Sequence, residues 1–537
     1  MSLALALAAL LAAPAPAEAK PVLIRPEERS AAQAIRPELL RGHIRFLASD
    51  LLEGRGPATR GDRLAQAYIA AQLEALGLEP AAPGGGWLQS FDLVGVKSRS
   101  PETLRLSKGA DGVDLKFSQD YVAFSGVQAS EARIDDAELV FVGYGIVAPE
   151  YGWDDYKGAD LKGKVLVMMN NDPEDDPKRF GGTTRLYYGR WTYKYEIAAQ
   201  QGALGAIIIH TTPSAGYGWQ VVQASNTGER FSLPHEGGPQ LAVRAWATEE
   251  ASRRIAQLAG QDLDALRAAA QKPDFKPVPL GVRISLTLQN EVQRKPTANV
   301  IGRLPGADEK LAQEAVLYTA HHDHLGLKAD AAAGEDAIYN GAVDNASGVA
   351  ALLAIAEAFK ALPRPPRRSV LFATVAAEEQ GLLGSAYLAA HPPVPAGRLA
   401  ANINIDGISI HGRTRDLTMI GLGKSSLDDY IKALAKAQGR VVVPDQFPDR
   451  GFFYRSDQFN LARIGVPAAY FDSGTDVIGK PAGYGKEQQE KYTAKDYHQP
   501  SDELRDDWDF SGAVEDTQLM FFLGARRPRA ERTWAAS

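Results

Sequence analysis

The sequence predicts an α/β protein whose central sheet is covered by helices on both faces. Apolar strands alternate with amphipathic helices between residues 314 and 406, which is the pattern of a sheet buried between helical layers. Residues 132–290 instead read as short strands broken by glycine and proline, which predicts a separate β-rich module. The 537 residues leave room for two to four domains of about 150 residues each.

Composition excludes several classes of protein. Hydrophobic residues make up 45% of the chain and charged residues 23%, as in ordinary globular proteins and unlike acidic disordered chains, collagen-like repeats or polytopic membrane proteins. The 59 basic and 66 acidic residues give a net charge of −7, without the basic footprint of a nucleic-acid binder. Cysteine is absent, so any metal site must be built from His, Asp and Glu.

The N-terminus predicts export. The apolar run Leu3–Ala13 is too short to span a bilayer, and Ala17-Glu18-Ala19 matches a cleavage site. We therefore expect a signal peptide over residues 1–19 and a secreted or periplasmic protein beginning at Lys20. No basic residue precedes the apolar run, which leaves a frayed Ala-rich helix or a misplaced start codon as alternatives. No later stretch reads as a membrane span.

The helical elements begin early in the chain. A helix is predicted from Gly61. Its apolar face is formed by Leu64, Tyr68, Ala71 and Ala75, with Ile69, Leu73 and Leu76 beside it. Gly77 is expected to cap it, and Pro80 prevents its continuation.

The later elements alternate. Within the β-rich segment, residues 282–289 alternate apolar and polar side chains, as a half-buried strand does. Lys295-Pro296-Thr297 then looks like a boundary. Beyond it, strands are predicted at 314–320, 368–377 and 400–406, with helices at 346–362 and 381–390.

Polar side chains follow these strands where functional groups collect in α/β sheets, beyond the carboxyl ends. Singly, each is more often a loop residue or, for Asp344-Asn345, a helix N-cap. If all of them were ordinary loop or cap residues, five polar groups would have to fall at the expected site positions by coincidence. This favours a functional site. The five groups are His321 to His324, Asp344-Asn345, Glu378-Glu379, Asp406 and His498.

This set suits a pair of divalent metal ions. Two imidazoles and three carboxylates can form two matched half-sites that share one bridging carboxylate. The additional glutamate of the Glu378-Glu379 pair is then free to move protons. Asp323 is spaced to accept a hydrogen bond from the other ring nitrogen of His321.

Five motifs together resemble the co-catalytic di-zinc aminopeptidase family, which includes glutamate carboxypeptidase and, in its wider clan, the transferrin receptor ectodomain. They are HHDHLG, IYNGAVDNASG, AAEEQGLLGS, NINIDG and YHQPSDE. The resemblance implies a zinc-exopeptidase three-layer sandwich with a mixed central sheet and an inserted protease-associated (PA) domain. It divides the chain into an N-terminal part of the catalytic domain (30–131), the insert (132–290) and the rest of the catalytic domain (291–525).

The resemblance also implies roles for the site residues. His321 and Asp406 would bind one zinc ion, Glu379 and His498 the other, and Asp344 would bridge them. Glu378 would be the general base and acid, Asp323 would orient His321, and Tyr497 would donate to the developing oxyanion. The Asp344–Asn345 peptide bond is often cis in such proteins. Val343 and Gln458 depart from the residues that many relatives carry there, and neither is a ligand position.

We expect a secreted exopeptidase with two zinc ions that removes N-terminal amino acids from peptides. A glutamate carboxypeptidase is the nearest alternative, and it would need arginines to hold substrate carboxylates. Our alignment puts Trp191 where such relatives carry one, with Arg190 one place away and Arg450 and Arg455 unplaced. A non-catalytic receptor ectodomain is less favoured because the ligand set is complete, and the bridging Asp344 argues against a one-zinc cyclase. Side-chain preference, oligomeric state and the physiological metal stay open.

Overall fold

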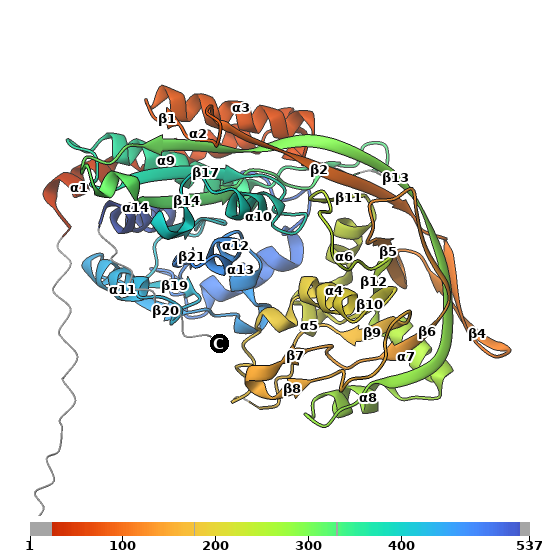
Figure 1. Cartoon of the computed structure of the whole chain (residues 1–537). Coiled ribbons are helices and arrows are strands. Elements are labelled where there is room, and N and C mark those ends of the chain that lie inside the picture. Colours follow the sequence, from red (N-terminus) through yellow and green to blue (C-terminus); the bar gives the residue numbers. More distant parts are fainter. Residues whose placement is uncertain (1–23, 177, 329–330, 527–537) are drawn as a thin grey trace, which may run out of the picture.

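The computed structural model describes residues 24–176, 178–328 and 331–526 (Figure 1). The expected signal peptide at 1–19 lies outside the described residues. The described chain is a mixed α/β protein, which confirms the predicted fold class. In these three segments, hydrogen bonds join 17 strands into one network.

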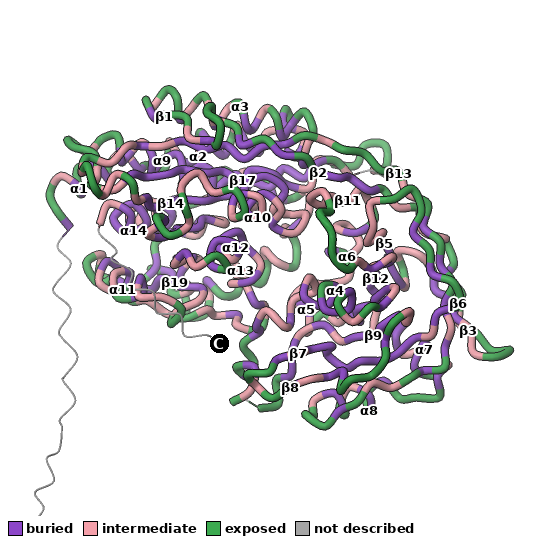
Figure 2. The backbone as a smooth tube through the Cα atoms, in the orientation of Figure 1, coloured by how far each residue is buried: buried purple, intermediate pink, exposed green. Residues whose placement is uncertain are grey.

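A mixed sheet forms the centre of the larger lobe. Its strand β14 lies parallel to β17 on one side and to β18 on the other, and β17 pairs antiparallel with β13. Both β14 and β17 are buried along their whole length (Figure 2). The strands, in spatial order, are β13 (Val278–Leu304), β17 (Ser369–Val375), β14 (Ala315–His321), β18 (Leu399–Asn404), β21 (Ala468–Asp472), β19 (Asp416–Ile420) and β20 (Val441–Pro444).

Helices cover both faces of this sheet, as predicted. Successive residues of a strand point to opposite faces, so Val316 and Tyr318 of β14 belong to one core and Leu317 to another. The first core is shared with α2 (Pro37–Leu47), α3 (Arg60–Ala75), α9 (Gly348–Lys360) and α14 (Ser511–Ala525). The second is shared with α10 (Leu383–Ala390) and α12 (Gln458–Arg463).

The predicted helix from Gly61 is α3, but its buried face differs from the prediction. Ala65, Ile69 and Leu73 are buried, whereas Ala71 and Ala75 are exposed. The apolar stripe is broad because small alanines occur all round the helix, and packing against the sheet selects the larger Ile69 and Leu73. Gly77 ends the helix with a φ of +72°, a conformation that glycine adopts without strain.

One helical stretch corrects the expectation that no later segment could cross a membrane. Ala342–Lys360 is long and apolar enough by length and composition alone. In the described structure most of this stretch is buried, and its α9 part packs between the sheet and the helices α2 and α14. It is therefore the core helix of the larger lobe.

A second, β-rich lobe has its own hydrophobic core. That core begins near Leu104, ahead of the boundary expected at residue 132. The reason is that β3 (Thr103–Lys108) pairs with β13, and β4 (Asp111–Lys116) pairs with β3. The other strands of this lobe include β5 (Tyr121–Ser125), β6 (Glu131–Phe141), β9 (Val165–Met169), β10 (Gly205–His210), β11 (Glu229–Ser232) and β12 (Val243–Thr248).

The long strand β13 runs through both lobes (Figure 1). Its first part pairs with β6 in the β-rich lobe, and its last part pairs with β2 (Leu88–Arg99) and with β17 of the central sheet. The boundary expected at Lys295–Thr297 therefore falls inside one continuous strand of 27 residues. Pro296 stays in register opposite Asp92 of β2.

Candidate metal centre

The five predicted ligand positions come together at the carboxyl edge of the central sheet. His321 is the last residue of β14, and Glu379 follows β17. Asp406 follows β18, and Asp344 lies in the irregular turn before α9. His498 lies beyond α13 (Tyr484–Lys495). Parallel neighbouring strands bring these ends to one place, as the sequence predicts.

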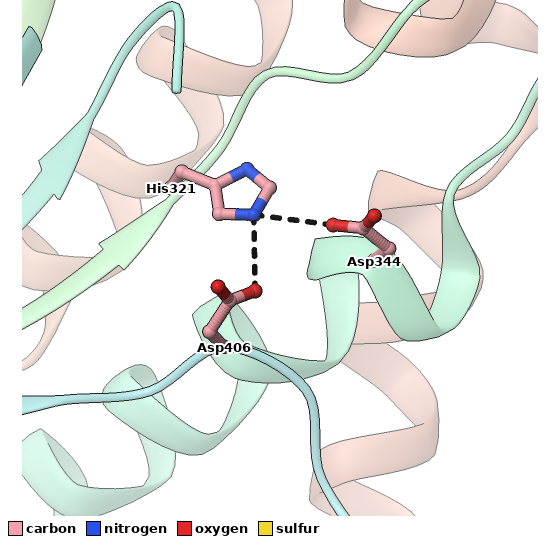
Figure 3. A group of neighbouring side chains, drawn as sticks. All are labelled: His321, Asp344 and Asp406. Atoms are coloured by element: carbon pink, nitrogen blue, oxygen red, sulfur yellow. Dashed lines mark hydrogen bonds and ion pairs between the residues drawn. The ribbon is translucent and has the colours of Figure 1, made fainter. Parts of the chain in front are cut away.

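One half of the cluster is built around His321. Its Nε2 atom is 3.2 Å from Asp344 Oδ1 and 3.2 Å from Asp406 Oδ1 (Figure 3). The His321 ring is buried, with only 1% of its side chain exposed. The three side chains therefore present one nitrogen and two oxygens to a common point.

The other half repeats this arrangement around His498. Its Nε2 atom is 3.3 Å from Asp344 Oδ2 and 3.0 Å from Glu379 Oε2. The two oxygens of Asp344 thus face different histidines, which is the geometry of a bridging carboxylate.

These distances fit zinc. Ligand atoms placed about 2.0–2.1 Å from a tetrahedral zinc ion lie about 3.3 Å from one another, close to the 3.0–3.3 Å found in both halves. Both ring nitrogens of His498 are buried without a hydrogen-bond partner of good geometry. A metal ion would satisfy Nε2, so the donor set and its spacing suit two cations.

The charges around the two histidines also favour bound cations. Burial lowers the pKa of His498, but Glu379 and Asp344 outweigh it and raise that pKa to about 10. Burial likewise opposes protonation of His321, yet Glu378, Asp344 and Asp406 raise its pKa well above the usual range. The cluster therefore strongly favours added positive charge.

A third imidazole, His324, has no assigned role in the predicted ligand set, yet the structure places it at the second half of the cluster. Its Nδ1 atom is 2.7 Å from Glu379 Oε1, and its ligand atom lies within 4.8 Å of those of Asp344 and Glu379. We assign the ligand role to His498, because its Nε2 faces the same two carboxylates that a second ion would bind. His324 contacts the opposite oxygen of Glu379 and so can orient that carboxylate.

Asp323 contacts His321 differently from the prediction. The ring nitrogen His321 Nδ1 lies 3.2 Å from the main-chain oxygen of Asp323 and 3.8 Å from its carboxylate. The carboxylate instead accepts hydrogen bonds from the main-chain amides of Glu378 and Glu379, at 3.0 and 3.4 Å. Asp323 therefore orients the His321 ring through its main-chain oxygen, and it orients the loop that carries Glu378 and Glu379 through its carboxylate.

Two polar side chains hold the Asp344 turn. Asn345 donates to the main-chain oxygen of Ile405 and accepts from the amides of Gly348 and Gly407. Asp502 accepts from the amides of Val343 and Asp344, at 2.9 and 3.1 Å. The Asp344–Asn345 peptide bond is cis, as in the family that the motifs resemble. The N-cap position of α9 is Ser347, so neither Asp344 nor Asn345 is the N-cap residue.

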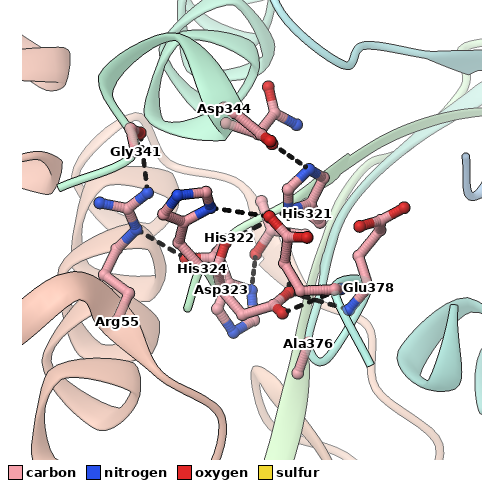
Figure 4. Close-up of polar contacts among 12 residues, drawn as sticks. Arg55, His321, His322, Asp323, His324, Gly341, Asp344, Ala376 and Glu378 are labelled. Atoms are coloured by element: carbon pink, nitrogen blue, oxygen red, sulfur yellow. Dashed lines mark hydrogen bonds and ion pairs between the residues drawn. The ribbon is translucent and has the colours of Figure 1, made fainter. Parts of the chain in front are cut away.

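Arg55 was not singled out from the sequence, yet it joins two of the site loops from the N-terminal part of the chain. Its buried guanidinium donates to the main-chain oxygens of His322 and Gly341 (Figure 4). It also donates to the main-chain oxygen of Asn340. A further hydrogen bond reaches the oxygen of Leu47. The glycines on either side of Arg55 are the only local signal in the sequence for such a turn.

Glu378 is the unliganded acid of the site. In the described part of the chain its carboxylate makes no hydrogen bond or ion pair. Burial, together with the nearby carboxylates of Glu379 and Asp406, raises its pKa well above the usual range, although His321 opposes the shift. A carboxyl group with a raised pKa is suited to taking up and returning a proton.

Tyr497 lies against the second half of the cluster. Its ring stacks on that of His498, with ring centroids 3.9 Å apart. Its hydroxyl oxygen accepts a hydrogen bond of 3.0 Å from Arg455 Nη2, which leaves its own O–H free to donate into the site. Gln458, a departure noted in the sequence, accepts a hydrogen bond of 3.0 Å from Asn404 Nδ2 and donates one of 2.7 Å to the main-chain oxygen of Phe453.

Two cavities adjoin the cluster. The larger, of about 200 Å³, includes His321, Asp344 and Asp406 in its wall. Its wall also includes the apolar and aromatic side chains of Ile408, Ile410, Phe447, Phe452, Tyr470 and Val477. The smaller, of about 100 Å³, has Arg190, Trp191 and Arg230 in its wall. Tyr217, Glu378, Glu379, Arg455 and Tyr497 line both.

A mixed sheet covered on both faces, with paired imidazole–carboxylate half-sites at its carboxyl edge, defines a class of α/β metalloprotein. The particular family follows from the sequence: residues 299–522 match the model described as Peptidase family M28. The chain is similar to peptidase family M28 over this region, which contains all five predicted ligands.

Individual relatives agree with this assignment. Aminopeptidase NAALADL1 of Mus musculus is 30% identical over 167 residues, which are 28% of this chain and 20% of that protein. The Rattus norvegicus protein of the same name is 33% identical over 120 residues, covering 21% of this chain and 14% of its own length. The matched region thus spans about a fifth or less of these curated relatives.

A solved structure shares the fold over nearly the whole chain. The aminopeptidase from Aneurinibacillus sp. strain AM-1 superposes with a TM-score of 0.53 at 20% identity. The superposition covers 94% of this chain and 97% of that one. At this level of identity the likeness concerns the fold.

Proposed function

We propose that the protein is a zinc-dependent aminopeptidase that hydrolyses the first peptide bond of its substrates. The observation that carries this proposal is the Asp344 carboxylate placed between His321 and His498, with the unpaired Glu378 beside them. The match to the peptidase family M28 model and the names of the relatives support the same activity. Two zinc ions held by the five ligands would polarise the scissile carbonyl and lower the pKa of a water molecule.

The chain's own residues would supply the proton movements. Glu378 takes a proton from the attacking water as the carbon–oxygen bond forms. It then gives this proton to the leaving nitrogen as the carbon–nitrogen bond breaks. Tyr497 donates a hydrogen bond to the carbonyl oxygen as negative charge develops on it. The carboxylates of the cluster offer a favourable partner for the α-ammonium group of a free amino end.

The test is a comparison of free and blocked amino ends. Zinc-loaded protein should hydrolyse leucine p-nitroanilide but not its N-acetyl form, and a chelator should abolish the activity until zinc is restored. Hydrolysis of N-blocked peptides from the carboxyl end would instead favour a glutamate-carboxypeptidase-like exopeptidase. Arg190 and Arg455 in the smaller cavity keep that alternative open. Zinc binding with no hydrolysis of any of these would point to a receptor-like protein.

Two further parts of the proposal concern the chain's organisation. We infer that the β-rich lobe is a PA-type insert, because it has its own hydrophobic core and because two of its segments resemble that domain, GYGIVAPEYGWDDYKGADLKGKVLV and KYEIAAQQGALGAIIIH. We also infer export to the periplasm or the medium; mature protein should begin at Lys20, and recovery of exported protein with Met1 intact would contradict this.

A further inference from the structure

The larger cavity has one carboxylate in its wall that does not belong to the metal centre. Asp472 is the last residue of β21 and lines this cavity together with Tyr470. Phe471, between them, lies in the core of the larger lobe, as the alternation of side chains along a strand requires. Among the described residues of the wall, Asp472 is the only acid outside the metal centre.

The sheet brings Asp472 to the same edge as the metal ligand Asp406. Strands β18 and β21 are parallel, and Asn404 pairs with Tyr470. Two residues further on, the two chains reach Asp406 and Asp472. The carboxyl ends of neighbouring parallel strands meet at one edge, so Asp472 extends the acidic edge of the site by one strand.

Asp472 has no cationic partner. In the described residues it makes no ion pair, and its side chain accepts only from the amide of Ser473 at 2.7 Å and from Gln489 Nε2 at 3.4 Å. Burial raises the pKa of Asp472 to about 7, and the carboxylates of Asp445 and Asp406 add to this shift. A carboxylate whose charge is disfavoured in this way is stabilised by any cation that enters the cavity.

The arginines in the same wall do not neutralise Asp472. Arg455 donates to the hydroxyl of Tyr497 at 3.0 Å. Arg450 donates to Thr493 Oγ1 at 3.2 Å. Both guanidinium groups are held by neighbouring hydroxyl groups, which leaves Asp472 to a cation from the substrate.

The loop after Asp472 is held in place by hydrogen bonds. Asp416 accepts from the amides of Thr475 and Asp476, at 3.0 and 2.9 Å. Gly474 lies so close to Asp416 that a Cβ on this glycine would be 2.3 Å from the Asp416 main-chain oxygen. A site that is fixed in advance loses little conformational entropy when it binds a ligand.

The cavity also offers apolar surface for the stem of a long side chain. Ile408, Phe452, Tyr470 and Val477 lie in its wall. Lysine and arginine bury their methylene groups along such surfaces, and aromatic rings attract their charged ends. Apolar walls with one free carboxylate therefore favour a long cationic side chain over a purely apolar one.

We propose that Asp472 makes the larger cavity a pocket for a first residue with a cationic side chain, lysine or arginine. This inference rests on the proposed function and names its substrate class: peptides whose amino-terminal residue is basic. The α-ammonium group is attached to the carbon next to the scissile carbonyl, so it stays beside the metal centre. The longer side chain reaches Asp472, which accepts charge-assisted hydrogen bonds from its end.

Matched pairs of substrates test the charge at the end of the side chain. Lysine p-nitroanilide is compared with norleucine p-nitroanilide, and arginine p-nitroanilide with the neutral citrulline compound of nearly the same shape. Zinc-loaded wild-type protein should prefer the cationic member of each pair tenfold or more in kcat/KM, expressed mainly in KM. Equal rates within both pairs, or a preference for the neutral members, would overturn the inference.

Variants tie the preference to Asp472. In Asp472→Asn the preference should fall to threefold or less in both pairs. The matched control is Asp476→Asn, in the same loop, whose exposed side chain pairs with Arg415; it should keep the full preference. An unchanged ratio in Asp472→Asn contradicts the assignment. If the rates for both members of each pair fall together, Asp472 binds the α-ammonium group that they share, and the pocket assignment is wrong.

A binding measurement separates this inference from the proposed function. Pentylguanidine carries a cationic end and an apolar stem but no peptide bond. In a calorimetric titration it should bind the zinc-loaded wild-type protein at least tenfold more tightly than neutral pentylurea, and Asp472→Asn should remove this difference. If the difference is found but no p-nitroanilide is hydrolysed, the aminopeptidase proposal fails and the cation pocket stands. If leucine p-nitroanilide is hydrolysed but neither the substrate preference nor the difference in binding is found, the pocket is wrong and the activity stands.

Discussion

The guanidinium group of Arg55 donates a hydrogen bond of 2.9 Å to the main-chain oxygen of His322, the residue that follows a metal ligand. The same group donates to the oxygens of Asn340 and Gly341, at 2.7 and 3.0 Å, just before the bridging Asp344. One side chain from the N-terminal segment thus fixes the separation of two ligand-bearing loops. Its own side chain is almost fully buried.

Replacing Arg55 should weaken both the fold and the metal centre. Arg55→Gln leaves several buried carbonyl oxygens without a donor, each costing about 1–3 kcal/mol. We expect a lower thermal midpoint and a reduced zinc content. Arg55→Lys, which restores the charge and fewer donors, should recover part of both. Differential scanning calorimetry and metal analysis measure these effects. Arg45→Gln, at an exposed position of α2, is the control; an unaltered zinc content in Arg55→Gln would refute the positioning role.

Removing the proton acceptor should separate binding from chemistry. Glu378→Gln preserves the shape of the side chain and leaves the five ligands in place, so zinc content should match the wild type. Its kcat should fall by about 10²–10⁴ because a general base of this kind contributes that much. Steady-state kinetics with leucine p-nitroanilide and metal analysis give both values. Glu291→Gln, on the exposed part of β13, should be unchanged; wild-type turnover in Glu378→Gln would remove this residue from the mechanism.

The two histidines near Glu379 should behave differently. His498→Ala removes an assigned ligand, and the purified protein should retain about one zinc ion per chain. His324→Gln removes only a partner of Glu379, so it should keep two ions but bind the second one about 10–100-fold more weakly. Competition with a chromophoric chelator measures both. Loss of a whole equivalent of zinc in His324→Gln would make His324 a ligand.

His43 should make folding stability depend on pH. This buried ring contacts the Tyr68 hydroxyl, with Nδ1 and the oxygen 2.8 Å apart, and burial lowers its pKa from 6.5 to about 4. The unfolded chain protonates His43 near pH 6.5 and the folded chain does so only near pH 4, so stability is lost as the pH falls through this window. Between pH 7 and 5 the loss is about 2 kcal/mol.

The variant His43→Gln isolates this effect from the titration of the metal ligands. Chemical denaturation at pH 7 and pH 5 gives the free energy of unfolding of both proteins. The wild type should lose about 2 kcal/mol more than the variant over this range. Equal losses would show that His43 titrates alike in the folded and unfolded chains.

Residues that follow predicted strands were placed correctly from the sequence. His321, Glu379 and Asp406 each end or follow a strand of apolar residues, and neighbouring parallel strands bring such ends to one edge. Asp344 and His498 join them through loops whose motifs resemble those of the family. The pattern of apolar residues, which is local, was enough to predict the sheet and its covering helices.

Contacts made by side chains from distant segments could not be predicted in this way. Asp323 lies two residues from His321, yet its carboxylate is taken up by two amides of the β17 loop. His324 belongs to a recognised motif, but only the fold brings it to Glu379. Pro296 suggested a domain boundary, but β13 continues through it. The strand is kept extended through both lobes by its long hydrogen-bonded pairings with β2 and β6.

Local patterns in the sequence were sufficient to predict the class of fold, to exclude thiolate ligands and, with the family resemblance, to propose the five candidate ligand side chains that the fold brings together. Their order along the chain follows the strand ends, which the local apolar pattern reveals. The contacts of Arg55 with the ligand loops, and the meeting of Arg190 and Arg230 with Arg455 beside Glu378, became visible in the three-dimensional fold. These groups come from separate lobes, and the free energy of such contacts depends on burial and charge, which no local pattern encodes.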